Sequence, residues 1–514
     1  MNKKIIIAII VVIAIGLGLF AMTNTNSSSS SSINIDTNAL EDGGNLIVDS
    51  ESLEKNKFNF HAESGDVNAI LVKNGGALKL ANSLINKTGD TQTSGDDADF
   101  YGVNSAILIN TNGTLDISNC EINTNSKGSN GIFVTNAEAS NSSGGDAGQN
   151  GGGEPPEATG NGGGDGGQPS EAAGNGSGNG GQPPEMSEGS SAGGQAPNGN
   201  GVGPSEATVS GTTKADIKNI KITTHSDKSR GLDATYNGII NAENVVINTD
   251  GQSCAALATD RGEGQVHVKN SEINTGVSKD SGRGSPLIYS TGNITLENSQ
   301  GTAFVSQIAC IEGKNSIELT NCDLTGYAEG NRKDGDVYVD LGGVFIYQSM
   351  SGDADVGTSQ FTAKNSKLTI AEDSSVYKES PMFHVTNTAC VIDLDNTELS
   401  FGSGTFIEVS GQNQWGNTGS NGGVAELNTN NEKIDGNVIV DSISSLNWTM
   451  KNTEFKGAIN STGNTTVNVA EGSTWTLTGD SSLFSLAVSG NIEYGNYSIT
   501  VNGQKYDSSN PFKG

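Results

Sequence analysis

The chain has 514 residues, and its 58 acidic and 28 basic side chains give a net charge of −30 at pH 7. This charge excludes nucleic acid and anionic membrane surfaces as partners, because both would repel the protein. With 71 glycines and 5% aromatic residues, the composition argues against a compact globule and favours a turn-rich repeat protein.

The N-terminus combines Lys3 and Lys4 with an uncharged, mostly apolar run from Ile5 to Met22. A run of this length lies on the boundary between a long signal peptide and a spanning helix, so we expect a signal peptide or signal anchor over residues 1–22. A Ser/Thr/Asn-rich stalk follows over residues 23–39. We therefore expect an extracellular protein, either secreted or held at the cell surface, whose only contact with a membrane is this N-terminal segment.

A short motif then recurs along the chain, with an asparagine two residues after one apolar residue and three before another, as in Leu80-Ala-Asn82-Ser-Leu-Ile85. Neighbouring copies are 23 to 28 residues apart where the repeat is tight. The nine full copies and one weakened copy place this asparagine at Asn82, Asn119, Asn219, Asn244, Asn270, Asn321, Asn365, Asn396 and Asn452, and at Asn298 in the weakened copy.

A unit near 25 residues with alternating apolar residues and no helical period is typical of one coil of a parallel β-helix. We predict an all-β, single-stranded parallel β-helix (solenoid) of roughly 15 coils, with residues 40–136 as its N-terminal part and 207–500 as its main part. The asparagines would form a structural ladder, buried and hydrogen-bonded from coil to coil. The longer gaps, 321 to 365 and 396 to 452, are interpreted as two coils each, with another residue in one asparagine position.

Between residues 137 and 206 the pattern stops, and Gly, Pro, Glu, Ser and Asn take over in imperfect repeats. Such a segment cannot bury a core, so we expect a disordered, low-complexity insertion extruded from one turn. It is interpreted either as a tolerated surface loop or as an arm that reaches wall or host material.

At the far end, residues 501–514 are expected to form a hairpin end and tail, with an Asn-Gly turn that caps the solenoid.

Cysteines and acidic stretches give no strong indication of a cofactor. The five cysteines, at 120, 254, 310, 322 and 390, are scattered and odd in number, so we interpret them as small core residues. No Cys-x-x-Cys or Cys-x-x-His pair exists, and we expect no metal site. The stretch from Gly95 to Asp99 is interpreted as a solvated loop, with weak calcium binding as the only cofactor interaction left open.

Catalytic motifs are nearly absent. Asn248-Thr-Asp250-Gly251 resembles the first signature of the polygalacturonase family, but the rest of that pattern, including a Gly-His-Gly, does not occur. We interpret these residues as the turn after Ile247 and assign no catalytic residue.

A second group of residues falls at similar places in successive coils between 229 and 326. If the coils stack, these residues form a mixed-charge stripe of the kind found on shallow sugar-binding faces. Turn chemistry with surface ion pairs is the alternative interpretation. The stripe would comprise Asp233, Asp260, Arg261, Tyr289, Glu312 and Lys314, and Trp415 in a polar loop is expected to be an exposed aromatic that stacks on a sugar.

This segment and its motifs resemble the repeats of secreted, adhesin-like proteins of gut methanogenic archaea and anaerobic Firmicutes, in the right-handed, pectin-lyase-like superfamily. The likeness covers most of residues 60–500 and rests on repeat motifs alone. It implies a right-handed β-helix and a non-catalytic surface adhesin that contacts a polysaccharide or a cell-surface glycan. A polysaccharide lyase or glycoside hydrolase of the same fold, and a structural envelope component, are the alternatives.

Overall fold

The computed structural model describes residues 35–93, 95–137, 211–281, 284–330, 333–334, 337–349 and 351–513. All of them belong to the compact unit Ile33–Gly514, which is separate from the unit Met1–Ser32. The protein is nearly all β, with 52% strand and 3% helix, and its long parallel sheets agree with the predicted all-β solenoid. The expected disorder of the 137–206 insertion falls almost entirely outside the described residues, as do the predicted N-terminal signal and most of the stalk.

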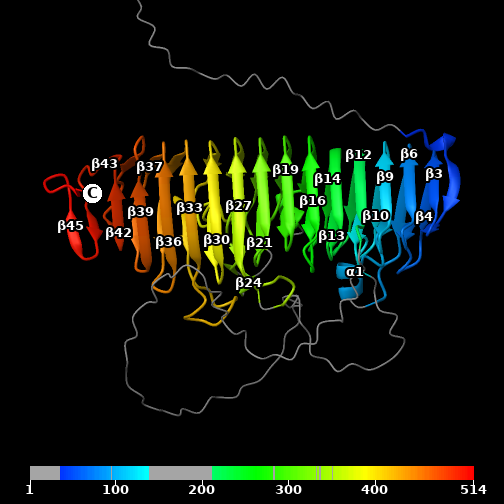
Figure 1. Cartoon of the computed structure of the whole chain (residues 1–514), viewed down its shortest axis with the longest axis horizontal. Helices are drawn as coiled ribbons and strands as arrows, with labels where there is room; N and C mark the ends of the chain where they lie inside the picture. Colours follow the sequence, from blue (N-terminus) through cyan, green and yellow to red (C-terminus); the bar gives the residue numbers. More distant parts are fainter. Residues whose placement is uncertain are drawn as a thin grey trace, which may run out of the picture. The chain divides into compact units, whose positions relative to one another are not determined.

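Two large sheets hold most of the strands, and successive strands of each sheet lie side by side (Figure 1). We call the 23-stranded one the long sheet and the 16-stranded one the second sheet.

The long sheet contains β1 (Glu41–Gly44), β3 (Ser52–Asn56), β4 (Phe58–Ala62), β6 (Ala77–Ala81), β7 (Leu84–Thr88), β9 (Thr114–Ser118), β10 (Glu121–Asn125), β12 (Lys214–His225), β14 (Ile239–Asp250), β16 (Gln265–Lys269), β17 (Glu272–Thr275), β19 (Asn293–Glu297), β20 (Gln300–Ala303), β22 (Ser316–Thr320), β23 (Asp323–Gly326), β27 (Thr358–Lys364), β28 (Lys367–Ile370), β30 (Ala389–Asp395), β31 (Glu398–Ser400), β33 (Val424–Asn430), β36 (Ser445–Lys451), β39 (Asn464–Val469) and β42 (Ser485–Val488).

The second sheet contains β2 (Leu46–Asp49), β5 (Ile70–Lys73), β8 (Ile107–Ile109), β11 (Ile132–Thr135), β13 (Leu232–Thr235), β15 (Leu257–Thr259), β18 (Ile288–Ser290), β21 (Ala309–Glu312), β26 (Val344–Tyr347), β29 (Phe383–Thr386), β32 (Thr405–Val409), β35 (Asn437–Val440), β38 (Ile459–Ser461), β41 (Ser481–Leu483), β44 (Ile499–Val501) and β45 (Gln504–Tyr506).

The remaining elements are a four-stranded sheet of β34 (Lys433–Asp435), β37 (Glu454–Lys456), β40 (Thr474–Thr476) and β43 (Asn491–Glu493), a two-stranded sheet of β24 (Lys333–Asp334) and β25 (Val337–Tyr338), the helix α1 (Gly95–Tyr101), and the short 3-10 helices Thr37–Ala39 and Lys279–Ser281.

The repeated asparagines bend the chain at one corner of each repeat. All nine have a left-handed backbone, with φ between 47° and 55°. Asparagine tolerates this conformation better than most residues that have a side chain. In the repeat around Asn119, for example, β9 ends just before the asparagine and β10 begins two residues after it, so one bend separates two strand segments of the long sheet.

The prediction that these asparagines are buried is wrong. Seven of the nine are exposed and the other two, Asn219 and Asn270, are partly exposed. The ladder itself exists on the outside, because the Asn321 amide donates to the Asn298 carbonyl oxygen at 2.9 Å and Asn396 donates to Asn365 at the same distance. The left-handed bend turns the asparagine side chain outward and the next side chain inward.

The residue after each asparagine is buried, and where its side chain is polar it forms a second ladder. The Ser271 hydroxyl accepts the backbone N–H of Val245 from the preceding coil at 3.1 Å, and Ser299 accepts that of Ser271 at 2.9 Å. Cys120 occupies the same position, and burial raises the pKa of its thiol to about 12. All five cysteines are buried, and none of them forms a disulfide. Cys120, Cys322 and Cys390 lie in the main core, as predicted, whereas Cys310 belongs to a smaller cluster on the outer face of the second sheet.

The two long gaps in the repeat have different causes. β22 pairs directly with β27, so Asn321 and Asn365 lie in adjacent coils and the prediction of two coils there is wrong. The extra residues form a loop that carries β24 and β25. The gap from Asn396 to Asn452 does hold two coils, but the position between them is filled by Asn431, also left-handed at φ 56°.

Aromatic side chains fill the core in the C-terminal half. A chain of ring contacts at 4.7–5.8 Å runs from Phe361 to Trp475 and includes Trp448, and both tryptophans are fully buried. The second sheet ends in the expected hairpin, in which β44 and β45 pair antiparallel around the left-handed residues Asn502 and Gly503.

The asparagine corner generates a stability prediction. We expect Asn321→Val to lower the free energy of unfolding by about 1–2 kcal/mol, because a β-branched residue is strained in the left-handed region. Asn321→Gly should lower it much less, since glycine adopts this backbone freely. Urea unfolding of both variants, with Thr320→Val on the neighbouring strand as control, measures the difference. Equal midpoints for the valine and glycine variants would contradict the assignment.

Candidate functional site

Three residues of the predicted stripe, Asp233, Tyr289 and Glu312, lie on the face of the second sheet that points away from the core, and the other three follow the ends of its strands. The outward positions of successive strands include Asp233, Ala258, Tyr289, Cys310 and Phe345, which pair in register. This face is covered rather than open. At one end α1 packs on this face, where the Thr235 hydroxyl donates to the backbone carbonyl of Phe100 in the helix at 2.9 Å.

Asp233 and Asp260 are brought together by Arg230. The guanidinium of Arg230 lies 2.7 Å from Asp260, 3.5 Å from Asp233 and 3.0 Å from Asp99 of α1, and Lys228 lies 3.2 Å from Asp99. Asp99 is only 5% exposed, so its interpretation as part of a solvated loop is wrong. Arg230, Lys228 and Asp99 are the members of this cluster that sequence reasoning missed, although Arg230 stands three residues before Asp233.

The buried charges do not balance, because three carboxylates face two cations. Burial raises the pKa of Asp233 to about 7, although Arg230 opposes this shift. Burial also raises the pKa of Asp260 well above its usual range, again against the attraction of Arg230. This cluster therefore fixes α1 to the sheet, and its carboxyl groups hold protons at near-neutral pH. Because they are buried, these carboxyl groups are not accessible to a large ligand.

The other stripe residues form separate contacts. The Tyr289 hydroxyl donates to Glu312 at 2.9 Å, and Glu312 is 2% exposed beneath Ser349, which also donates to it. Arg261 pairs with Asp353 at 2.5 Å. At the surface Lys314 pairs with two carboxylates, those of Glu263 and Asp355. The predicted continuous stripe is thus divided into four groups: the buried Arg230 cluster, the buried Tyr289–Glu312 pair, the Arg261–Asp353 pair, and Lys314 with its two surface carboxylates.

Trp415 is 7% exposed, so the expectation of an exposed aromatic is wrong. Its indole N–H donates to Asp340 at 3.0 Å, and its ring lies 4.9 Å from that of Tyr347. The polar loop folds back on itself, since the Asn421 amide donates to the backbone carbonyl of Trp415. The sequence of the loop shows its polarity but not this closure.

Beside Trp415 the covering loops leave a hollow of about 320 Å³ that sequence analysis did not find. Residues from β29, from the end of β32 and from the loops around 340, 380 and 412 line it. We call it the His384 hollow. Its polar groups are the side chains of Glu379, His384, Glu408, Ser410, Gln412, Asn413 and Gln414.

The hydrogen bonds of the His384 hollow define its chemistry. His384 Nδ1 lies 2.9 Å from the Leu341 carbonyl, which can only accept, so Nδ1 carries the proton and neutral His384 presents Nε2 as an acceptor. The Ser410 hydroxyl lies 3.4 Å from Nε2 but donates to Glu408 at 2.9 Å. The shorter bond directs the serine proton to the carboxylate, so this serine is not arranged as a nucleophile.

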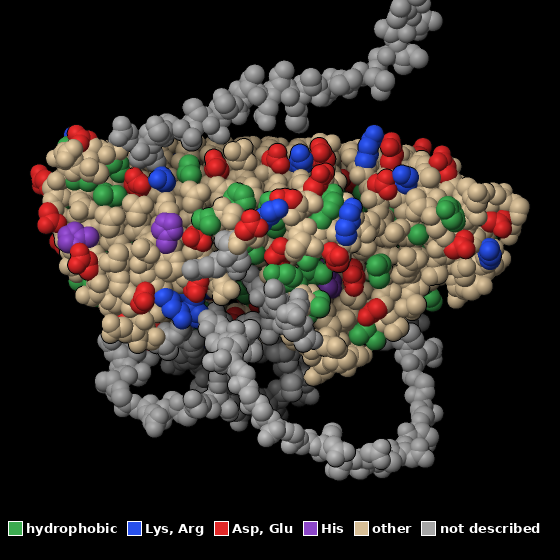
Figure 2. All heavy atoms as spheres, turned by 180° about the vertical axis from the view of Figure 1, so that it is seen from behind, with side chains coloured by type: hydrophobic (Ala, Val, Ile, Leu, Met, Phe, Trp, Pro, Cys, Tyr) green, Lys and Arg blue, Asp and Glu red, His purple; other side chains and the backbone are tan. Residues whose placement is uncertain are grey.

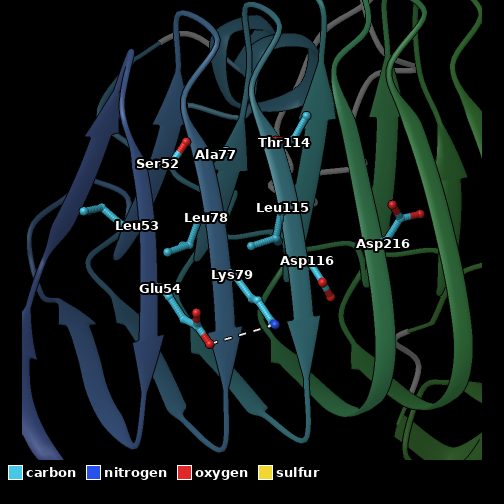
Figure 3. A pocket seen from close by; sticks show the side chains of 10 residues that line it. All are labelled: Ser52, Leu53, Glu54, Ala77, Leu78, Lys79, Thr114, Leu115, Asp116 and Asp216. Carbon is cyan, nitrogen blue, oxygen red and sulfur yellow. Dashed lines mark ion pairs between the residues drawn. The ribbon is translucent and has the colours of Figure 1, made fainter.

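A second hollow, of about 470 Å³, lies over β3, β6, β9 and β12 of the long sheet. Figure 3 shows its outward charged side chains on neighbouring strands, among them Glu54, Lys79 and Asp116. Lys79 and Glu54 are 3.9 Å apart and well exposed. An exposed pair of this kind contributes little, so we interpret this hollow as ordinary sheet surface.

Within the described ranges, no group of three or more His, Cys, Asp or Glu side chains could hold a metal ion. In the same part of the chain, no helix is long and apolar enough to cross a membrane. No family model matches the chain, and no curated protein matches it.

The Arg230 cluster predicts a pH dependence of stability. The raised pKa of Asp233 means that the folded state binds more protons than the unfolded state between about pH 4 and 7. Its contribution to stability is complete below about pH 4 and is lost as the pH rises through 7. Melting temperatures should therefore fall from pH 5 to pH 8 by less in Asp233→Asn than in the wild type. The exposed control Asp216→Asn should keep the wild-type slope, and an unchanged slope in Asp233→Asn would contradict the assignment.

Proposed function

We propose that this protein is a right-handed, single-stranded parallel β-helix, displayed outside the cell, that contacts carbohydrate through its long sheet without catalysing a reaction. The strand pairing supports the β-helix, because each repeat from β3 to β31 adds two segments to the long sheet and one strand to the second sheet in a constant order. The N-terminal apolar run and the net charge of −30 support the location.

One observation carries the proposed contact. Nine successive coils of the long sheet place a neutral polar side chain at the same outward position, and all nine residues are partly exposed, although the Thr369 hydroxyl oxygen itself is buried. We call this set the neutral column. It consists of Asn86, Asn123, Thr223, Asn248, Asn274, Thr302, Thr325, Thr369 and Ser400.

The neutral column suits a polymer of sugars. Amides and hydroxyls bond sugar hydroxyls without the cost of desolvating a charge. The groups recur at the spacing of the strands, about 4.8 Å, so a polymer with a regular repeat can use several of them at once. Charged side chains lie elsewhere on the surface, and Figure 2 shows acidic ones scattered over one face with basic ones between them. Acidic polymers are therefore poor ligands.

The column replaces the predicted stripe as the contact surface. Asp233 and Glu312, which an enzyme of this fold would need in an open cleft, are at most 2% exposed. Asn248, from the motif that resembles a polygalacturonase signature, lies in the neutral column, where its carbonyl oxygen accepts the amide of Asn274 at 3.1 Å. These positions favour binding over catalysis.

The proposal predicts retention on a neutral polysaccharide. The double variant Asn274→Lys/Thr302→Lys places two bulky charges in the column, and we expect about tenfold weaker retention on plant, mucin or microbial glycans. The matched control Thr449→Lys/Asn468→Lys changes paired residues of β36 and β39 on another part of the same sheet and should bind as the wild type does.

Retention and new reducing ends are measured together on the same samples. An equal loss of retention in both double variants would contradict the neutral column as the contact surface. New reducing ends would contradict the absence of catalysis, and no retention at all would favour a structural role.

A further inference from the structure

We propose that the His384 hollow binds an amino sugar, through the protonated primary amine and the hydroxyls of one sugar unit. The hollow lies on the second-sheet side of the coils and shares no residue with the neutral column. This inference therefore does not depend on the function proposed above.

The hollow is formed by fixed walls. The Gln412 amide donates to the backbone carbonyl of Val339 at 3.3 Å, and the backbone N–H of Gly411 donates to Asp441 at 2.8 Å. The Trp415–Asp340 bond closes the far side of the same loop. Because these contacts exist without a ligand, binding requires little reorganisation. Its volume of about 320 Å³ lies at the lower end of the range for small-ligand sites.

The charge of the hollow selects a cation. Glu379 and Glu408 contribute carboxylates, and the described residues that line it include no lysine or arginine. Glu379 is exposed at the rim, while Glu408 is half-buried and already accepts the Ser410 hydroxyl at 2.9 Å. A carboxylate can accept further donors, so an ammonium group placed between these side chains gains charge-assisted hydrogen bonds.

Two of the neutral groups of the hollow contribute acceptor atoms. His384 has Nε2 as its acceptor, because Nδ1 donates to Leu341, and the Ser410 hydroxyl and the Gln412 amide each lie 3.4 Å from Nε2. The Gln412 side-chain oxygen is buried without a hydrogen-bond partner among the described residues, and its partial negative charge adds to the field of the carboxylates. A ligand rich in N–H and O–H donors matches this set better than an acceptor-rich one.

The remaining surface matches a sugar ring rather than a bare amine. Pro381 and Leu341 provide apolar walls for the C–H face of a ring. Asn413, exposed, and Gln414, half-buried, carry amides that can both donate to and accept from hydroxyls. Polar and apolar groups combined in this way are typical of small-molecule sites.

The test titrates the full chain calorimetrically with β-linked trimers of glucosamine, N-acetylglucosamine and glucose, and with lysine amide. We expect the glucosamine trimer to bind at least about tenfold more tightly than the other three probes, and more weakly as salt is added. Glu379→Gln, whose exposed side chain should not affect folding, and Glu379→Gln/Glu408→Gln should each weaken binding, the double variant by about tenfold or more. The exposed Glu426→Gln on the long sheet should bind as the wild type does.

Any of three results would overturn the assignment: no binding of the glucosamine trimer, equal binding of the acetylated trimer, or binding that neither glutamine variant weakens. Tighter binding of lysine amide would show that the hollow recognises an amine without the sugar. The variant Asn274→Lys/Thr302→Lys should keep full affinity for the glucosamine trimer. A result that contradicts the neutral column as a contact surface can therefore be distinguished from one that contradicts the amino-sugar site.

Discussion

The left-handed asparagine corner is the constraint on which the rest of the structure depends. One residue with φ near 50° in each repeat reverses which side of the chain faces the core. The residue after it then points inward, where Ser271 and its equivalents satisfy the backbone of the preceding coil. Because this reversal occurs at the same place in every repeat, residues such as Asn248 and Asn274 align into one outward column.

Much of this fold could be predicted from the period of the motif, and each wrong prediction has a specific physical cause. The asparagines were predicted to be buried because strict alternation of inward and outward side chains assumes an extended backbone throughout. The left-handed residue interrupts this alternation. Asn431 escaped notice because Thr429 stands two residues before it, where the motif has an apolar residue. The gap before Asn365 was counted as two coils because sequence length does not separate an inserted loop from a coil.

The candidate site was less predictable, because its outer layer comes from distant parts of the chain. The helix α1, which precedes Asp233 by more than a hundred residues, and the loop that carries Trp415 both cover the second sheet. Sequence periodicity reveals the strands but not what lies over them. A usable signal was present, however, since Phe133, Ala258 and Cys310 share the outward column with Asp233, and apolar residues at outward positions indicate a covered face.

In the functions proposed above, the residues that hold the framework differ from those that contact a ligand. Coil packing and the Arg230 cluster hold the framework, while the neutral column and the His384 hollow offer two surfaces of different chemistry on different sheets. A neutral column suits repeated weak contacts along a polymer, whereas a hollow with two carboxylates suits one cationic group. The neutral column requires that each coil contribute one residue in the register described.

Spin labels at Asn241 and Asp393, with the buried native thiols unlabelled, test this register most directly. The pairing places these residues five coils apart, through His267, Thr295, Glu318 and Thr362. At about 4.8 Å per coil, the account predicts a single narrow distance near 24 Å by pulsed electron spin resonance. A distance of about 29 Å, which requires a sixth coil, or a broad distribution of distances would contradict this register.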